Sequence, residues 1–166
     1  VNMEQWEWVQ PEGGYRSPSL ASAPGPHPDI TAWSAREYGH RVGVFRVLDV
    51  LDKHGIKPTV AMDTLTAENY PWLVKHHVGR GDEIIGHGMS LSRMITSRMS
   101  EQEERDYIQT SLTSLNKATG ATAAGWLGPE FGESTRTPAL LGEAGIRYTC
   151  DWVNDDQPFR MNTPQG

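Results

Sequence analysis

The stretch Asp82-Glu83-Ile84-Ile85-Gly86-His87-Gly88 holds the strongest indication of the fold. Its apolar pair predicts a short buried strand from Glu83 to Gly86, which ends at a histidine between two glycines. A glycine on each side allows a sharp turn and the close approach of a ligand. Because functional side chains of parallel α/β folds gather at the carboxyl ends of strands, His87 is a candidate active-site residue. A satisfied structural histidine is the alternative interpretation.

Strand and helix patterns alternate along the rest of the chain. Strands are predicted at Val1 to Val9, Thr59 to Met62, Glu83 to Gly86, Thr122 to Leu127 and Ile146 to Val153. Helices are predicted from Ser34 to His54, Ala67 to Val78, Ser100 to Ala118, and from Thr137 until Gly145 closes the last one. This alternation implies a parallel sheet joined by right-handed crossovers, so the predicted fold class is α/β.

One long segment fits neither pattern. Five prolines and three glycines fall between Gln10 and Ser34 and predict an irregular loop. Loops of more than about 15 residues inside a compact domain are usually functional or disordered. We therefore predict a lid or rim over the site.

Length and charge limit the classes of function. A chain of 166 residues is long enough for one domain with a core. Its 15 Lys and Arg residues against 21 Asp and Glu residues give a net charge of −6, which argues against a nucleic-acid partner. No apolar run approaches the roughly 18 residues of a spanning helix, and Val1 to Glu4 lacks a signal-peptide pattern, so we expect a cytoplasmic protein without a membrane partner. The single cysteine, Cys150, is interpreted as a buried, inert thiol.

Polar and aromatic residues lie within or just past the predicted strands. They are Glu4, Gln5, Asp63, His87, Trp126, Asp151, Asp155 and Asp156. Because the carboxyl ends of parallel strands share one edge of the sheet, we expect these residues to converge on one face.

Several ordered blocks of sequence carry a resemblance to a known family. They are Asn2 to Trp6, Tyr38 to Gly43, Arg80 to Glu83, Gly86 to Gly88, Gly125 to Pro129 and Asp151 to Pro158. Together they resemble the polysaccharide deacetylase (NodB-homology) superfamily, and within it the allantoinase and cyclic-imidase branch. The resemblance implies parallel (β/α) units of a distorted, incomplete (β/α) barrel, with hydrolysis of a carbon–nitrogen amide bond on its carboxyl face.

The resemblance also bears on metal binding. Metal-using members carry two adjacent carboxylates, a base and a ligand, and the matching positions here are Glu4 and Gln5. They also carry two histidines four positions apart, which match His87 and Leu91. Only one of three ligands remains, and one imidazole is too little to hold zinc. We therefore expect no catalytic metal and no other cofactor.

Without a metal, the chemistry needs a base and donors for an oxyanion. Glu4 fits the general base, with a pKa raised by desolvation beside Trp6. His87, with backbone N–H groups near Gly88, fits the oxyanion donor. On residue type alone, a solvated carboxylate near the terminus is the better explanation of Glu4, and the motif reverses this preference.

The remaining candidates are predicted to bind substrate. They are Trp6, Trp126, Glu130, Asp151, Trp152, Asp155 and Asp156. Trp126 and Glu130 occupy the block where other family members place a substrate-contacting arginine. Asp155 and Asp156 are equally well explained as solvated loop acids.

The predicted function is metal-independent hydrolysis of a small cyclic amide, imide or ureide. The alternatives are a metal-dependent N-deacetylase of carbohydrates and a catalytically inactive binding or assembly module. The family is considerably longer than 166 residues, so residues 1–166 are interpreted as one catalytic domain truncated at both ends. An open parallel sheet leaves a bare edge, from which we expect a homo-oligomer.

Overall fold

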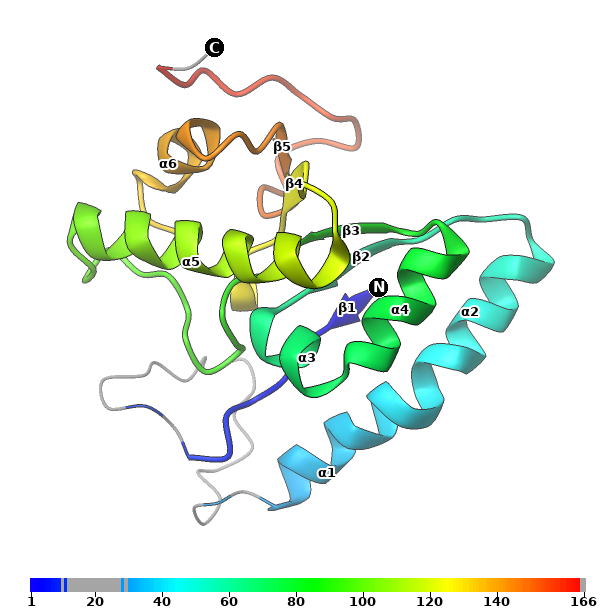
Figure 1. The fold of residues 1–166 in the computed structure, drawn as a ribbon. Coiled ribbons are helices and arrows are strands. Elements are labelled where there is room, and N and C mark those ends of the chain that lie inside the picture. Colours follow the sequence, from blue (N-terminus) through cyan, green and yellow to red (C-terminus); the bar gives the residue numbers. More distant parts are fainter. Residues whose placement is uncertain (10, 12–27, 29, 165–166) are drawn as a thin grey trace.

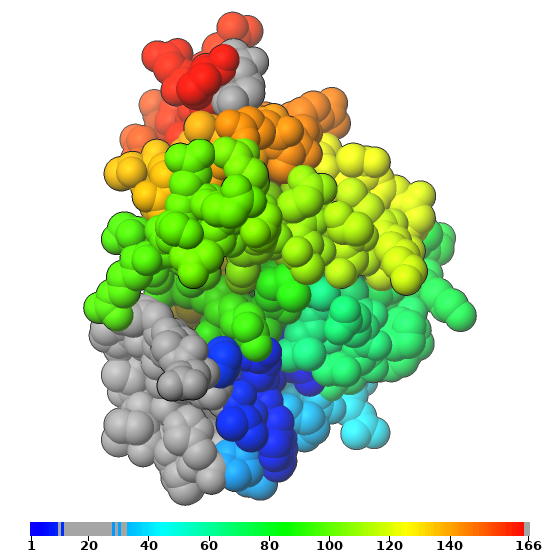
Figure 2. Space-filling view, turned by 60° about the vertical axis from the view of Figure 1, so that its left-hand side comes forward, coloured from blue at the N-terminus to red at the C-terminus, as the bar shows by residue number. Residues whose placement is uncertain are grey.

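The computed structural model describes residues 1–9, 11, 28 and 30–164 (Figure 1). In this part of the chain five strands form one sheet in the order β1-β2-β3-β4-β5. The strands are β1 (Asn2–Met3), β2 (Thr59–Met62), β3 (Glu83–Gly86), β4 (Gly125–Trp126) and β5 (Tyr148–Thr149). Every neighbouring pair is parallel, which confirms the predicted α/β class. The sheet does not close, so β1 and β5 are its edges. Figure 2 shows the N-terminal residues (blue) in the lower half of the molecule and the C-terminal segment (red) at its top.

The bounds of β2 and β3 agree with the prediction, whereas β1, β4 and β5 are shorter. The predicted strand lengths are wrong where backbone N–H groups donate to side chains instead of to a neighbouring strand. The backbone N–H of Gln5 donates to the side chain of Asp63, and that of Ala123 donates to Asn116. The Cys150 N–H still bonds the Trp126 carbonyl, after which the chain leaves the sheet. Cys150 is exposed, which corrects the expected burial.

The first helical region consists of α1 (Ile30–Tyr38), the π-helical turn η2 (Gly39–Gly43) and α2 (Val44–Lys53). It begins four residues before the predicted Ser34, inside the segment that we predicted to be loop. Apart from Pro11, Pro28 and residues 30–34, the predicted lid lies outside the described residues. At the other end His54 follows Lys53 as the C-cap, close to the predicted end.

The helix predicted from Ala67 to Val78 is two helices, α3 (Thr64–Asn69) and α4 (Pro71–Arg80). Tyr70 separates them, with φ −125° and ψ 59°, because the residue before a proline is driven out of the helical region. The side chain of Asp63 caps α3 by accepting the Thr66 N–H at 2.7 Å.

Three further elements follow β3. Helix α5 (Glu101–Thr119) begins with a capping box between Ser100 and Glu103, and ends at Gly120. The 3₁₀ turn η3 (Pro129–Phe131) follows β4, and α6 (Thr137–Glu143) precedes β5. None of the helices among the described residues is long and apolar enough to cross a bilayer.

The two faces of the sheet differ in what covers them. Figure 1 shows α3, α4 and α5 in front of the sheet, and the larger core cluster lies on that side. It contains Val60 and Met62 of β2 and Trp126 of β4. The alternate residues Ala61, Ile85 and Leu127 form a separate small cluster. Because side chains alternate across a strand, His87 lies on the same side as Ile85, away from α5.

Gly86 permits the close approach of β3 and β4. A Cβ atom at this position would lie 2.7 Å from the Trp126 ring and 2.9 Å from Leu112. Gly88 meets a second requirement, since its φ of +69° is left-handed and a Cβ there would lie 2.6 Å from Pro129. The two glycines beside His87 therefore serve packing and turn geometry.

Candidate active site

The structure brings Glu4 and His87 together across the ends of β1 and β3. His87 Nε2 lies 2.9 Å from Glu4 Oε2. The histidine side chain is 2% exposed and the carboxylate 21% exposed, so the carboxylate is the member of the pair that solvent reaches. This contact joins residues 83 positions apart.

The tautomer of His87 follows from its second contact. Its Nδ1 lies 2.6 Å from the carbonyl oxygen of Leu127, and a carbonyl only accepts, so Nδ1 carries a proton. The remaining exchangeable proton is therefore shared between Nε2 and Glu4. Burial favours the neutral ring, but the hydrogen bonds to Glu4 and Leu127 outweigh it and raise the pKa of His87.

Arg36 of α1 is a further member of the site, which the sequence prediction missed. Its Nη1 donates to Glu4 Oε1 at 2.8 Å, and its guanidinium lies 5.3 Å from the centre of the Trp6 ring. Trp6 is thus next to the site, where its ring packs against the guanidinium of Arg36. The strand-end argument could not find Arg36, because a helix supplies it.

The two cationic partners set the charge of Glu4. Burial alone would raise the pKa of Glu4, and the hydrogen bonds and charges of His87 and Arg36 outweigh it, so that the pKa is lowered. This corrects the expected raised pKa: desolvation is present, but two partners stabilise the carboxylate. Glu4 is consequently an ionised group at neutral pH.

Glu130 faces the same group of residues from η3. Burial and the Glu4 carboxylate raise the pKa of Glu130, whereas Arg36 and His87 act against the shift. Pro129, its neighbour, contacts Gly88 next to His87. Glu130 thus lies within electrostatic reach of Glu4 and His87, and its predicted role in binding substrate stays a prediction.

The two positions that match metal ligands of the family, Gln5 and Leu91, hold side chains that do not serve as metal ligands here. Gln5 donates to the Tyr70 hydroxyl at 3.1 Å and accepts from Asn69 at 2.7 Å, and its backbone N–H donates to Asp63. Leu91 is 1% exposed and has no donor atom for a metal. Burial raises the pKa of Asp63 to about 7, and its carboxyl is occupied by capping α3. Within the described ranges no group of three His, Cys, Asp or Glu residues has the arrangement of a metal site. This donor set does not fit the metal centre of the family's metal-using members.

Trp126 does not line the site, which corrects the pocket-wall prediction. It is 0% exposed and belongs to the core cluster on the α5 side of the sheet. The strand alternation explains the error, because it turns Leu127 rather than Trp126 toward the face that carries His87.

Asp151 and Trp152 lie at the rim beside β4. Asp151 Oδ1 accepts the N–H of Gly128 at 2.7 Å, and Trp152 Nε1 donates to Glu133 at 2.8 Å. Burial and the neighbouring Asp151 raise the pKa of Glu133 to about 8. Asp151 therefore supports the turn that carries Glu130.

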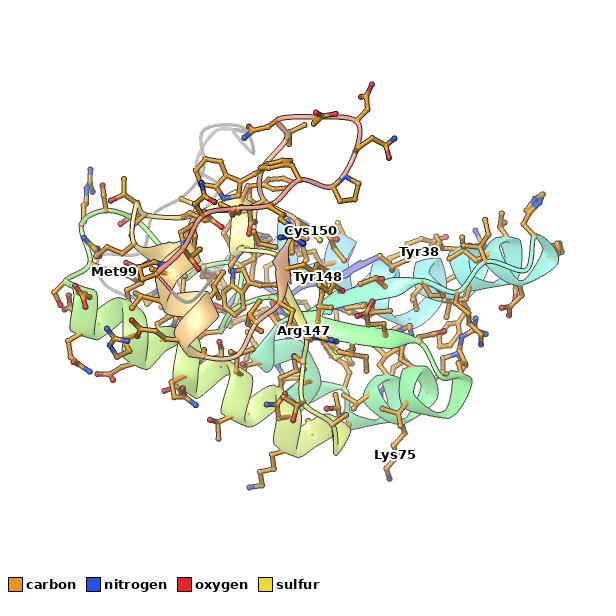
Figure 3. The ribbon with its side chains drawn as sticks, turned by 90° about the horizontal axis from the view of Figure 1, so that it is seen from above. Tyr38, Lys75, Met99, Arg147, Tyr148 and Cys150 are labelled. Atoms are coloured by element: carbon orange, nitrogen blue, oxygen red, sulfur yellow. The ribbon has the colours of Figure 1, made fainter. Side chains whose placement is uncertain are left out.

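Asp155 and Asp156 are not brought to Glu4 and His87. They border a hollow formed by β5, α6 and the C-terminal segment, where Asp155 accepts the Gln157 N–H. In Figure 3 Tyr148 and Cys150 mark this edge of the sheet, and Lys75 projects from α4 away from it. The expected convergence thus holds for Glu4 and His87, with Asp63 among the charges that act on His87, and fails for Trp126, Asp155 and Asp156.

A parallel α/β sheet with a carboxylate–histidine pair at its carboxyl edge defines the general class, a (β/α) domain with a polar site at the ends of its strands. The chain belongs to the polysaccharide deacetylase family, because the sequence model of that family matches residues 24–149.

Comparisons with individual proteins agree with this assignment. The chain is similar to peptidoglycan deacetylase-like protein FGM2 of Gibberella zeae, with 29% identity over 76% of this chain and 38% of the relative. The structure is similar to Puue allantoinase, with a TM-score of 0.76 and 27% identity over 99% of this chain and 56% of that one. A probable polysaccharide deacetylase from Pseudomonas aeruginosa PAO1 gives a TM-score of 0.77 at 26% identity, over 95% and 54% of the two chains. The chain thus spans about half the length of these solved relatives, and less of the curated one.

Proposed function

We propose that this chain carries the water-activating part of a metal-independent amide hydrolase. The substrate class is a small cyclic amide, imide or ureide, and the reaction cleaves its carbon–nitrogen bond. Membership of the deacetylase family and the likeness to Puue allantoinase support the reaction class. The observation that carries the proposal is Glu4, a partly exposed carboxylate held on one oxygen by Arg36 and on the other by His87.

Glu4 takes a proton from water, whose oxygen then attacks the carbonyl carbon. Each carboxylate oxygen has two lone-pair sites, so an oxygen that accepts from Arg36 or His87 can also accept from water. The lowered pKa of Glu4 keeps it in the basic form.

His87 holds the base and supplies positive charge next to it. Both ring nitrogens face protein groups, Glu4 and the Leu127 carbonyl, so we replace the expected oxyanion-donor role by this positioning role. A positive charge beside the reacting carbonyl stabilises the oxyanion through the field of the site.

A metal-dependent N-deacetylase is the competing function, favoured by the relative described as peptidoglycan deacetylase-like. The side chains of Gln5 and Leu91 argue against it, because neither is a zinc ligand.

The test is turnover on a panel of cyclic ureides, cyclic imides and N-acetylated sugars, with wild type and Glu4→Gln. The expected result is hydrolysis of a ring amide or imide, with a loss of about 100-fold to 10,000-fold in the variant, typical of a missing general base. Circular dichroism melting of both proteins checks that the fold survives. Wild-type rates in Glu4→Gln would remove Glu4 from the mechanism, and turnover confined to acetylated sugars would replace the proposed substrate class.

A further inference from the structure

Glu130 is the second carboxyl group at this site. We propose that Glu130 is a catalytic residue, the acid that protonates the leaving nitrogen while Glu4 takes the proton of water. The inference rests on the proposed function and assigns to this chain a proton donor for the second half of the reaction.

The backbone of Glu130 is in a conformation that side chains rarely adopt. Its φ is 54° and its ψ 27°, and Phe131 after it has a φ of 56°. Two consecutive left-handed residues that are not glycine are disfavoured by contacts of Cβ with the backbone. Such strain persists where the surrounding structure imposes it, and it clusters at functional sites.

The turn is held in place from two sides. Pro129 packs on Gly88, where a Cβ atom would lie 2.6 Å from the proline ring. On the other side Gly132 lies against Met94 and the Ile95 carbonyl, so closely that a Cβ atom there would be 2.0 Å from Met94. The carbonyl that orients His87, that of Leu127, leads into the same turn. The position of Glu130 is therefore tied to that of His87.

Three charged groups act on the Glu130 carboxyl, each from a different element: Glu4 after β1, His87 after β3 and Arg36 of α1. Burial first, and then the Glu4 carboxylate, raise the pKa of Glu130, whereas Arg36 and His87 act against this shift. The same two cationic groups lower the pKa of Glu4, to which they are hydrogen-bonded, so the pKa values of the two carboxyl groups shift in opposite directions. A pair of carboxyl groups whose pKa values are pushed apart is the usual basis for one base and one acid in a site.

The reaction balances with these two groups. The oxygen of water forms a bond with the carbonyl carbon, and the proton of water goes to Glu4. The carbon–nitrogen bond breaks with its electron pair on nitrogen, which takes the proton of Glu130. The product is one opened molecule with a carboxylic acid at one end and the released nitrogen at the other, as an amine from a ring amide, an amide from an imide or a urea from a ureide. The two carboxyl groups return to their starting states by proton exchange with solvent.

The first experiment compares leaving groups. Wild type, Glu130→Gln and Phe131→Gly are assayed on the ring amide that wild type turns over and on p-nitrophenyl acetate, whose phenolate leaves without protonation. Glu130→Gln should lose about 100-fold or more in kcat on the amide, typical of a missing general acid, and less than about threefold on the ester. Phe131→Gly removes the adjacent left-handed side chain and keeps the carboxyl group, so it should retain both activities. An unchanged amide rate in Glu130→Gln, or equal losses on both substrates, would overturn the proposal.

The second experiment follows pH. A group with a lowered pKa gives the acidic limb of the kcat profile and an acid with a raised pKa the alkaline limb, so Glu130→Gln should lose the alkaline limb only. In ¹³C-labelled protein, Glu4→Gln should lower the pKa of Glu130, because it removes a neighbouring negative charge. A Glu130 titration that is identical in wild type and Glu4→Gln would show that the two carboxyl groups do not face each other, and this result needs no turnover. Wild type inactive on every amide would contradict the proposed function instead.

Discussion

Arg36 and Glu4 form an ion pair at 2.8 Å that joins helix α1 to the end of strand β1. The side chains are 23% and 21% exposed, so the pair is neither buried nor fully solvated. It links the charge state of the base to a helix outside the sheet.

The Arg36 contact predicts a shift in the pH dependence of turnover. Arg36→Gln removes a positive charge from Glu4 and should raise the pKa of Glu4, so the acidic limb of kcat/KM moves to higher pH. Arg36→Lys restores the charge without the planar fork and should recover part of the shift.

Stability measurements give the same comparison without turnover. A carboxyl group with a lowered pKa in the folded state stabilises the fold above its ordinary value of 4.5, and this contribution disappears as the pH falls through the folded pKa. Wild type and Arg36→Gln should therefore differ in urea unfolding at neutral pH and converge in acid. A constant difference at all pH values would contradict the assignment.

Chelator treatment should change neither melting temperature nor turnover. The reason is the occupation of Gln5 by Tyr70 and Asn69, and the absence of a donor at Leu91. The measurement is thermal unfolding and activity after dialysis against a chelator, followed by addition of zinc. A melting temperature that falls with chelator and recovers with zinc would revive the metal-dependent deacetylase.

Gly86→Ala should destabilise the fold by about 1–3 kcal/mol, the usual cost of overpacking a core. Its new methyl group would lie 2.7 Å from Trp126 and force β3 and β4 apart. Gly79→Ala in α4 is the matched control, because nothing lies within 4 Å of its added Cβ. A helix interior favours alanine over glycine by about 0.5–1 kcal/mol, so the control should be stabilised. Equal effects in urea unfolding would show that the close approach of the two strands is not limiting.

The open edge of the sheet predicts self-association of these 166 residues at micromolar concentration. Among the described residues β5 pairs with β4 alone, and Tyr148, Trp152, Val153 and Phe159 are exposed around it. Unpaired strand edges with apolar neighbours favour pairing with a second chain. Sedimentation is the measurement, and Tyr148→Lys is the variant expected to restore a monomer. A cooperative wild-type monomer that binds no apolar dye would contradict the homo-oligomer proposal.

The sequence predicted β2, β3 and α5 well because their signals are local. An apolar run ending in glycine and a capping box each determine a boundary without distant partners. The ends of β1 and β5 depend on where the neighbouring strand stops offering hydrogen bonds, which no local pattern contains. The break at Tyr70 has a local cause, because Pro71 disfavours helical backbone at the residue before it.

The candidate site was predictable to the extent that strand ends define it. Glu4 and His87 follow β1 and β3 directly, so the parallel arrangement brings them together. The position of Trp126 was predicted wrongly because polar and apolar residues do not alternate clearly in β4 and its flanks. The sequence therefore does not show which face of the strand is buried. Arg36 was missed because its reach depends on the packing of α1 against the end of β1.

The π-helical turn between α1 and α2 explains how one helical region serves two surfaces. Within this turn, the Val44 N–H bonds the Gly39 carbonyl, five residues back, which widens the helix by one residue. After the turn, Val44 and Leu48 of α2 pack into the core, and before it Arg36 of α1 reaches Glu4. One residue of an α-helix corresponds to a rotation of about 100°. Deletion of a single residue from Gly39–Gly43 would leave Val44 and Leu48 packed in the core and rotate Arg36 away from the Glu4 carboxylate. The extra residue of the turn therefore lets the same helical region pack into the core and reach the site.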